Sequence, residues 1–201
     1  MKNIRISLVI TLVSFLFVLF SVKTINAQLS TNEKEGLIYM YEEEKLAHDV
    51  YKTLSEKYTV PVFKNITKSE AYHMSLVLDL IKKYKLKDPS GKAQGEFENK
   101  ELQKLYNDLI EKGAKSLIDA LEVGATIEDV DIFDLEKLND KVKNEEINKL
   151  YRQLICGSEN HMRAFTGHLK FRDKVYSQQY LSKSRYKEII NGEHKKCFEL
   201  K

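Results

Sequence analysis

Acidic residues and histidines interrupt four stretches of this sequence that otherwise have the apolar spacing of core-facing helices. The stretches are "YMYEEEKLAHDVY" (39–51), "SEAYHM", "IEDVDI" and "SENHMRAF". Apolar residues recur in and around each stretch at steps of three and four, the spacing that places side chains on one face of a helix. Followed along these faces, six side chains able to bind a metal point toward the core: Glu44, Glu70, His73, Glu128, Asp131 and His161.

A shared metal site would explain why all four stretches place polar groups inside. An isolated charge in a protein core is strongly disfavoured, so it is paired, neutralised or bound to a cation. Carboxylates together with neutral imidazoles are ligands that suit iron or manganese, and helical bundles can hold two such ions between facing helices. The pattern therefore predicts a site for iron or manganese, which could hold two ions as a di-metal centre.

Ordinary explanations exist for each residue taken alone. Glu70 could complete a capping box with Thr67, and a lone core histidine such as His161 is more often hydrogen-bonded than a ligand. Three consecutive glutamates usually form a solvated helix face, and we expect Glu42 and Glu43 to be exposed. For the whole set, the alternative is buried ion pairing without metal.

The fourth stretch carries an incomplete motif. Di-iron bundles take a Glu from each of two helices and a Glu-x-x-His pair from each of the other two. Here Ser158 stands where the second pair needs its Glu, and Asp131 is the candidate that compensates for it. Glu159 lies about 100 degrees around an ideal helix from that line, so we do not expect it to be a ligand.

The elements that must position these residues are helices. The chain has two prolines and eight glycines, and helical spacing continues nearly throughout. We expect long helices at about 30–57, 61–86, 115–138 and 144–174, with the third interrupted or bent near Gly124 and a short helix at 99–113 in the loop-rich connection. Two helical hairpins joined by a long crossover predict an all-α four-helix bundle.

The first 27 residues read as a secretory signal peptide. A basic start is followed by an uncharged run of 17 residues and by Ala27 at a suitable cleavage position. An uncleaved anchor is the alternative, whereas a lipoprotein is disfavoured because the residue directly after Ala27 is not a cysteine. Cleavage removes three of the 33 basic residues and none of the 30 acidic ones, so the formal charge of +3 falls to zero. We therefore expect no nucleic-acid partner, and no membrane span after cleavage.

The predicted organisation is a signal peptide at 1–27, a helical bundle at 28–175 and a tail at 176–201 with a short helix in "SKSRYKEIIN". Cys156 and Cys197 are too far apart in sequence for a CxxC site. They could pair in an oxidising compartment, but sequence alone leaves this open.

The chain resembles rubrerythrins at the stretches that carry the polar residues. "EKLAHDVY", "SEAYHM", "GATIEDVDI" and "SENHMRAF" are similar to segments of their four helices, over roughly residues 35–170. The chain also resembles, more closely, an uncharacterised prokaryotic family with a ferritin-like fold, known only as a domain of unknown function. These resemblances imply a ferritin-like fold. They also imply, position by position, that the six residues are metal ligands, whereas Ser158 does not match the ligand expected at its position.

The rubrerythrin resemblance implies a di-iron centre that reduces peroxide or oxidises ferrous iron. The four-cysteine module that supplies electrons to rubrerythrins is missing, so an external electron donor is implied. We expect an exported metal-binding protein, either with oxidase or peroxidase activity or as a non-catalytic metal-binding or structural bundle with a degenerate site. Metal ions are the expected partners, and a homodimer is among the expected assemblies.

Overall fold

Helices form the framework of the part of the chain that this computed structural model describes, residues 28–197, in which no β-strand occurs. The all-helical prediction is confirmed. The helices are α1 (Thr31–Lys57), α2 (Pro61–Lys83), α3 (Lys100–Gly113), α4 (Leu117–Asn139), α5 (Glu145–Lys170) and α6 (Lys183–Asn191).

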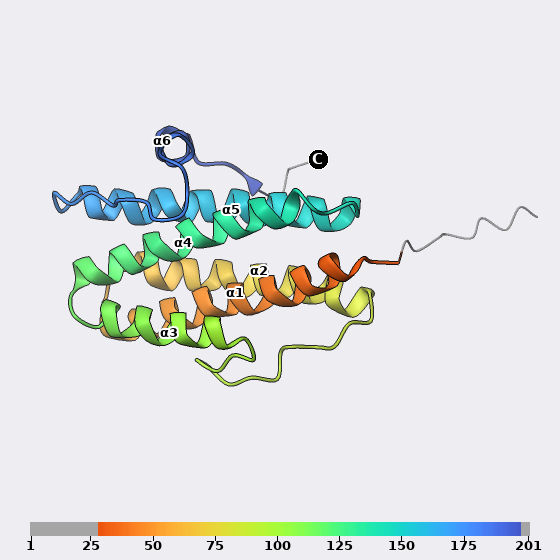
Figure 1. Ribbon diagram of the computed structural model, residues 1–201. Coiled ribbons are helices and arrows are strands. Elements are labelled where there is room, and N and C mark those ends of the chain that lie inside the picture. Colours follow the sequence, from red (N-terminus) through yellow and green to blue (C-terminus); the bar gives the residue numbers. More distant parts are fainter. Residues whose placement is uncertain (1–27, 198–201) are drawn as a thin grey trace, which may run out of the picture.

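The four long helices pack as two antiparallel pairs (Figure 1). α1 packs along α2 and α4 packs along α5, and the two pairs lie one above the other. The crossover between the pairs contains α3, which packs against α1 and α4. α6 lies on the outer side of α5 (Figure 1).

Local sequence signals explain where the helices start. Ser30 and Glu33 form the capping box of α1, and Pro61 occupies the first turn of α2, where its missing N–H costs nothing. Because α2 starts at Pro61, Glu70 lies in mid-helix. The Thr67 hydroxyl donates to the Phe63 carbonyl, so the capping explanation for Glu70 is wrong. α2 and α5 end at 83 and 170, before the predicted 86 and 174.

Helix α4 runs without a break through Gly124, so the predicted interruption there is wrong. A Cβ at this position would overlap the ring of Phe165 on α5. The glycine therefore serves close packing between α4 and α5, which overrides its poor helix propensity.

The apolar core consists of two clusters on either side of the polar stretches. On each long helix, one end packs into the first cluster and the other end into the second; on α2, for example, Phe63 and Ile66 belong to one cluster and Val77 and Ile81 to the other. The acidic residues and histidines lie between the two clusters. They form a polar layer across the protein that apolar side chains seal on both sides.

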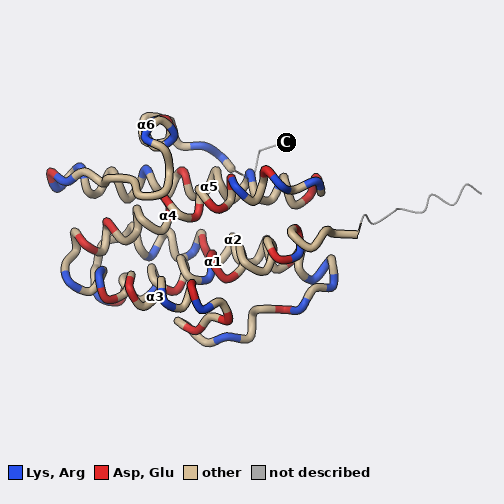
Figure 2. Tube along the Cα trace, viewed as in Figure 1, with Lys and Arg blue, Asp and Glu red and all other residues tan. Residues whose placement is uncertain are grey.

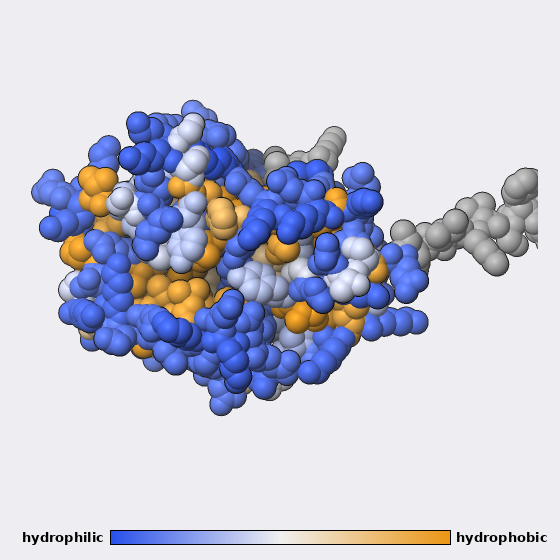
Figure 3. Space-filling view, viewed as in Figure 1, coloured by the Kyte–Doolittle hydropathy of each residue, from blue (hydrophilic) through white to orange (hydrophobic). Residues whose placement is uncertain are grey.

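Acidic and basic residues alternate over the helices, as Figure 2 shows, and hydrophilic residues dominate the face seen in Figure 3, where apolar atoms lie recessed between them. Among residues 28–197, no helix has the length and apolar character needed to cross a membrane. The proposed signal peptide lies outside the described residues, and the division of the chain at 27 and 175 stays a prediction.

Candidate metal centre

The four long helices bring the six predicted residues into the buried polar layer. α1 provides Glu44, α2 and α4 provide two residues each, and α5 provides His161. Five of the six form two groups of three, in which one donor atom per residue lies within 4.8 Å of the others. The groups are Glu44, Glu70 and His73, and Glu70, Glu128 and His161.

Glu70 joins the two groups through its two carboxylate oxygens. Its Oε2 lies 2.8 Å from His73 Nδ1, and its Oε1 lies 2.9 Å from His161 Nδ1. Each histidine nitrogen also faces a second carboxylate: Glu44 Oε2 is 3.2 Å from His73 Nδ1, and Glu128 Oε2 is 3.5 Å from His161 Nδ1. The two imidazole rings stack with their centroids 5.5 Å apart.

Two buried atoms of these candidate ligands have no hydrogen-bond partner among the residues that the structure describes. They are Glu44 Oε1 and His161 Nδ1, whose short approach to Glu70 is not aligned as a hydrogen bond. Buried polar atoms are nearly always satisfied in proteins, so unsatisfied ones call for an explanation such as an ion.

Asp131 lies in the same layer but outside both groups. Its Oδ2 accepts a 2.5 Å hydrogen bond from Ser158, and its Oδ1 is buried without a partner. Ser158 therefore does not leave a gap in the layer. Its hydroxyl holds the carboxylate that was expected to compensate for it.

A family model described as an uncharacterized protein domain (DUF2202) matches residues 33–193, most of the chain. The chain belongs to the DUF2202 family. Uncharacterized protein MJ0754 of Methanocaldococcus jannaschii is 52% identical over 165 residues, which cover 82% of this chain and 89% of that protein. The crystal structure of hypothetical protein MJ0754 matches with a TM-score of 0.82 at 50% identity, over 83% of this chain and 96% of the other. These comparisons establish the family and assign no activity.

The glutamates and histidines in the polar layer of this DUF2202 protein shift one another's pKa values. Burial would lower the pKa of His161, but the carboxylates of Glu70 and Glu128 outweigh it and raise that pKa to about 10. Burial raises the pKa of Glu44 to about 7 despite the opposing charge of His73. For Glu70 the two histidines outweigh burial and lower its pKa. Glu70 is thus the most firmly ionised carboxylate of the three.

Neighbouring side chains hold these groups in place. The Tyr51 hydroxyl donates to Glu128 Oε1 at 2.5 Å, and His161 Nε2 lies 3.0 Å from Ser69 Oγ. A Cβ at Gly157 would come within 2.6 Å of the His73 ring, so a glycine on α5 makes room for this imidazole. Contacts of this kind fix the orientation of metal-binding side chains.

The expectation that Glu42 and Glu43 are exposed is wrong. Glu42 is buried because it accepts hydrogen bonds from the backbone amides of Glu98 and Asn99, just before α3. Glu43 is buried with neither oxygen hydrogen-bonded, and burial together with the charges of Asp134 and Glu44 raises its pKa well above the usual range. The burial of Glu42 and Glu43 depends on the crossover and α4, which pack on α1 and are distant from it in sequence.

Sequence reasoning missed the role of Asp129 in this DUF2202 protein and left the pairing of its two cysteines open. Asp129 is fully buried and accepts hydrogen bonds from the backbone amides of residues 179–181 and from the Tyr176 hydroxyl, which fixes the segment after α5. Cys156 and Cys197 form a disulfide, which resolves the question left open by the sequence. Glu159, not expected as a ligand, pairs instead with Arg185 and Lys195.

Proposed function

We propose that this protein is a ferritin-like bundle whose polar layer holds a di-metal centre of iron or manganese. The observation that carries the proposal is Glu70, a single carboxylate shared by two groups that each add one carboxylate and one histidine. Glu70 would be shared by the two ions, Glu44 and His73 would complete the ligands of one, and Glu128 and His161 would complete those of the other. The resemblance to rubrerythrins in four short motifs supports the same assignment.

The donor set fits these metals. It contains three carboxylates and two imidazoles and no thiolate, which favours iron or manganese over the softer metals. The unsatisfied Glu44 Oε1 and His161 Nδ1 are atoms that an ion would satisfy. Asp131 Oδ1 has no hydrogen-bond partner among the described residues, and Asp131 would approach the ions from outside the two ligand groups.

Two redox-active ions held between carboxylates would supply the electron transfer needed to reduce peroxide or to oxidise ferrous iron. The chain itself binds and orients. Tyr51 fixes Glu128, and the Ser69 hydroxyl oxygen would accept a hydrogen bond from His161 Nε2–H in the tautomer that leaves Nδ1 free to bind an ion. The apolar clusters above and below the layer exclude water. If the reaction needs electrons that the substrate does not supply, an external electron donor would provide them. The homodimer stays a prediction.

A metal-free structural role is the second candidate, favoured by the ion pairs within the layer. Both histidines face two carboxylates each, and burial, which lowers the pKa of His73, is outweighed by the charges of Glu44 and Glu70, which raise it. Two protonated histidines would compensate most of the charge of three glutamates. Such a layer could fold without any ion.

Metal analysis separates the two candidates. The purified protein is stripped with a chelator, titrated with Fe²⁺ or Mn²⁺ and compared with Glu70→Ala, and the loaded protein is assayed for ferrous oxidation and for peroxide consumption. We expect two ions per chain in the wild type and a loss of binding in Glu70→Ala. Folded wild-type protein that takes up neither metal would refute the centre and support the ion-paired layer. Uptake without turnover would support a binding role.

We also propose that the protein is exported. The disulfide supports this, because such bonds persist in oxidising compartments and are rare in reducing ones. Mass spectrometry of the protein expressed in its own host should find a chain that starts near Gln28. An intact Met1 would contradict cleavage.

A further inference from the structure

A cavity of about 330 Å³ opens beside the polar layer. α2 contributes Ser69 and His73 to its wall, α5 contributes Asn160 and His161, and the segment after α6 contributes Lys195. We call that segment, residues 192–197, the C-terminal strap. The cavity is therefore bounded by both histidines of the proposed centre on one side and by the strap on another.

The exposure of the site residues indicates that solvent reaches the layer from the histidine side. Glu44, Glu70 and Glu128 are each 2% exposed, whereas His73 is 5% and His161 7% exposed. The cavity is lined by these two histidines and by none of the three glutamates. It is thus the side from which a molecule can approach the donor atoms with the least rearrangement.

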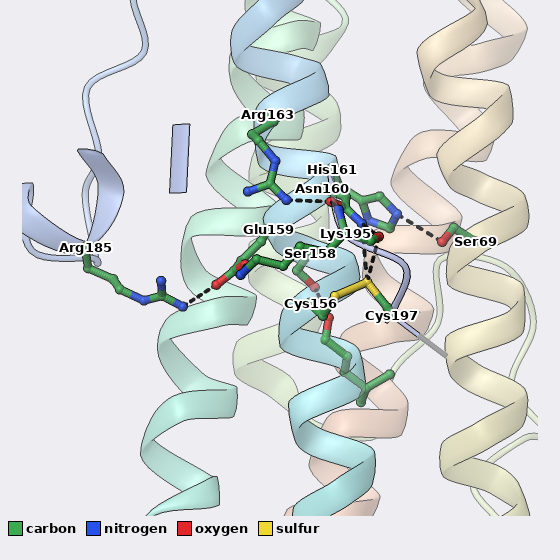
Figure 4. The surroundings of a disulfide bond; sticks show 11 residues. Ser69, Cys156, Ser158, Glu159, Asn160, His161, Arg163, Arg185, Lys195 and Cys197 are labelled. Carbon is green, nitrogen blue, oxygen red and sulfur yellow. Dashed lines mark hydrogen bonds and ion pairs between the residues drawn. A yellow bond between two sulfur atoms is a disulfide. The ribbon is translucent and has the colours of Figure 1, made fainter. Parts of the chain in front are cut away.

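One turn of α5 holds the strap in place (Figure 4). Cys156 forms the disulfide with Cys197. The Asn160 side chain donates to the Lys195 carbonyl at 2.9 Å and accepts from the Lys195 amide at 3.0 Å. Glu159 forms an ion pair of 2.8 Å with the Lys195 ammonium group.

The same turn of α5 also faces the proposed centre. Gly157 packs on His73, Ser158 holds Asp131, and His161 is itself a candidate ligand. The strap residues 192–196 are exposed, and Cys197 is half-buried. The strap therefore has little apolar packing of its own, and the disulfide is its covalent attachment to α5.

We propose that the cavity is the entrance to the centre for small, uncharged, hydrogen-bonding molecules, and that the disulfide keeps the strap over it until the disulfide is reduced. This inference rests on the proposed di-metal function. The size class follows from the cavity volume. The preference for uncharged molecules follows from the lining of the metal-loaded protein, in which His73 and His161 would be neutral ligands. The rest of the lining includes hydroxyl and amide groups, and the Lys195 charge is paired with Glu159.

The redox step is a thiol–disulfide exchange with an external dithiol. Its thiolate attacks the more exposed Cys197 sulfur, and Cys156 leaves as the thiolate and takes up a proton. The second thiol of the reductant then releases Cys197 as a thiol and closes the reductant's own disulfide. Two electrons and two protons pass from the dithiol to the protein. The strap loses its disulfide attachment to α5 and keeps its hydrogen bonds to Asn160 and its ion pair with Glu159.

A fluorescent reporter tests the inference without any metal. The chain contains no Trp, so Tyr72→Trp, at a half-exposed residue of the cavity wall, introduces a single one. Phe133→Trp, at a residue 38% exposed on α4, is the matched control, because Phe133 packs against Tyr180 in the segment that Asp129 holds. Acrylamide quenching is measured in the oxidised protein, after reduction with dithiothreitol, after re-oxidation, and in the Cys197→Ser background, with circular dichroism to verify the fold.

We expect quenching at position 72 to rise about twofold on reduction, to fall again on re-oxidation and to be high in Cys197→Ser, with no change at position 133. Quenching at position 72 that does not respond to the disulfide, or that changes equally at position 133, overturns the inference. A reversible quenching change in a protein that binds no Co²⁺, Fe²⁺ or Mn²⁺ supports the strap as a cover and refutes only the metal centre.

Discussion

Replacing Glu70 by glutamine should destabilise the metal-free protein, whereas replacing Glu43 by glutamine should not. Both side chains are 2% exposed and belong to the same polar layer, and both substitutions keep size and shape. They differ in their partners. Glu70 lies within 2.9 Å of both histidine nitrogens, whereas neither oxygen of Glu43 has a hydrogen-bond partner.

Glu70→Gln should lower the free energy of unfolding by about 3–5 kcal/mol, the cost of removing one partner of a buried ion pair and leaving the other uncompensated. For a chain of this size each kcal/mol corresponds to about 2–4 °C, so the melting temperature should fall by roughly 10 °C. Glu43→Gln should change the free energy of unfolding by less than about 1 kcal/mol or raise it. Neither Glu43 oxygen has a hydrogen-bond partner among the described residues, and the charges of Asp134 and Glu44 that act on it are negative.

The pH dependence of stability should separate the two variants further. The pKa of Glu70 is lowered in the folded protein, so its contribution is present above its unfolded pKa and is lost as the pH falls. The pKa of Glu43 is raised, so the wild type should lose stability as the pH rises above about 4, and Glu43→Gln should remove that loss.

Urea unfolding of chelator-treated, disulfide-intact protein at pH 5 and pH 8, followed by circular dichroism, measures both effects. The reasoning would be refuted if the two variants lost equal stability at pH 8. It would also fail if Glu70→Gln were the more stable of the two.

The remaining predictions concern metal binding, helix packing and the crossover. His73→Ala should weaken metal binding by about tenfold or more, whereas His48→Ala, outside both ligand groups, should leave it unchanged in a Co²⁺ titration. Gly124→Ala should lower the free energy of unfolding by about 1–3 kcal/mol, because the added methyl group would overlap an aromatic ring of α5. Gly167→Ala is the control: no described atom lies within 4 Å of the added methyl group, so the free energy of unfolding should stay the same or rise by up to about 1 kcal/mol. Glu42→Ala should lower the free energy of unfolding by about 1–3 kcal/mol, because two backbone amides near the start of α3 lose their acceptor. Its metal affinity should be unchanged, and a loss of metal binding would show that Glu42 belongs to the centre.

The sequence by itself determined the helices and the main line of core-facing residues along each of them, but not the burial of Glu42, Glu43 and Asp129. These properties are local: the capping box at Ser30 starts α1, Pro61 starts α2, and the three-residue spacing of Glu70 and His73 places both on one face of the same helix. A charged side chain in a protein core must be paired, neutralised or bound to a cation, so charged residues on the core-facing lines predict a polar site inside the bundle.

Only the tertiary structure decided which atoms meet. That Glu70 serves both histidines depends on the register of α2 against α5, and the burial of Glu42 and Glu43 depends on the crossover and α4 packing over α1. The Cys156–Cys197 disulfide likewise depends on how the strap folds back along α5. Helical periodicity describes one helix at a time, whereas these contacts join segments far apart in the chain, whose relative positions are set by the packing of the whole core.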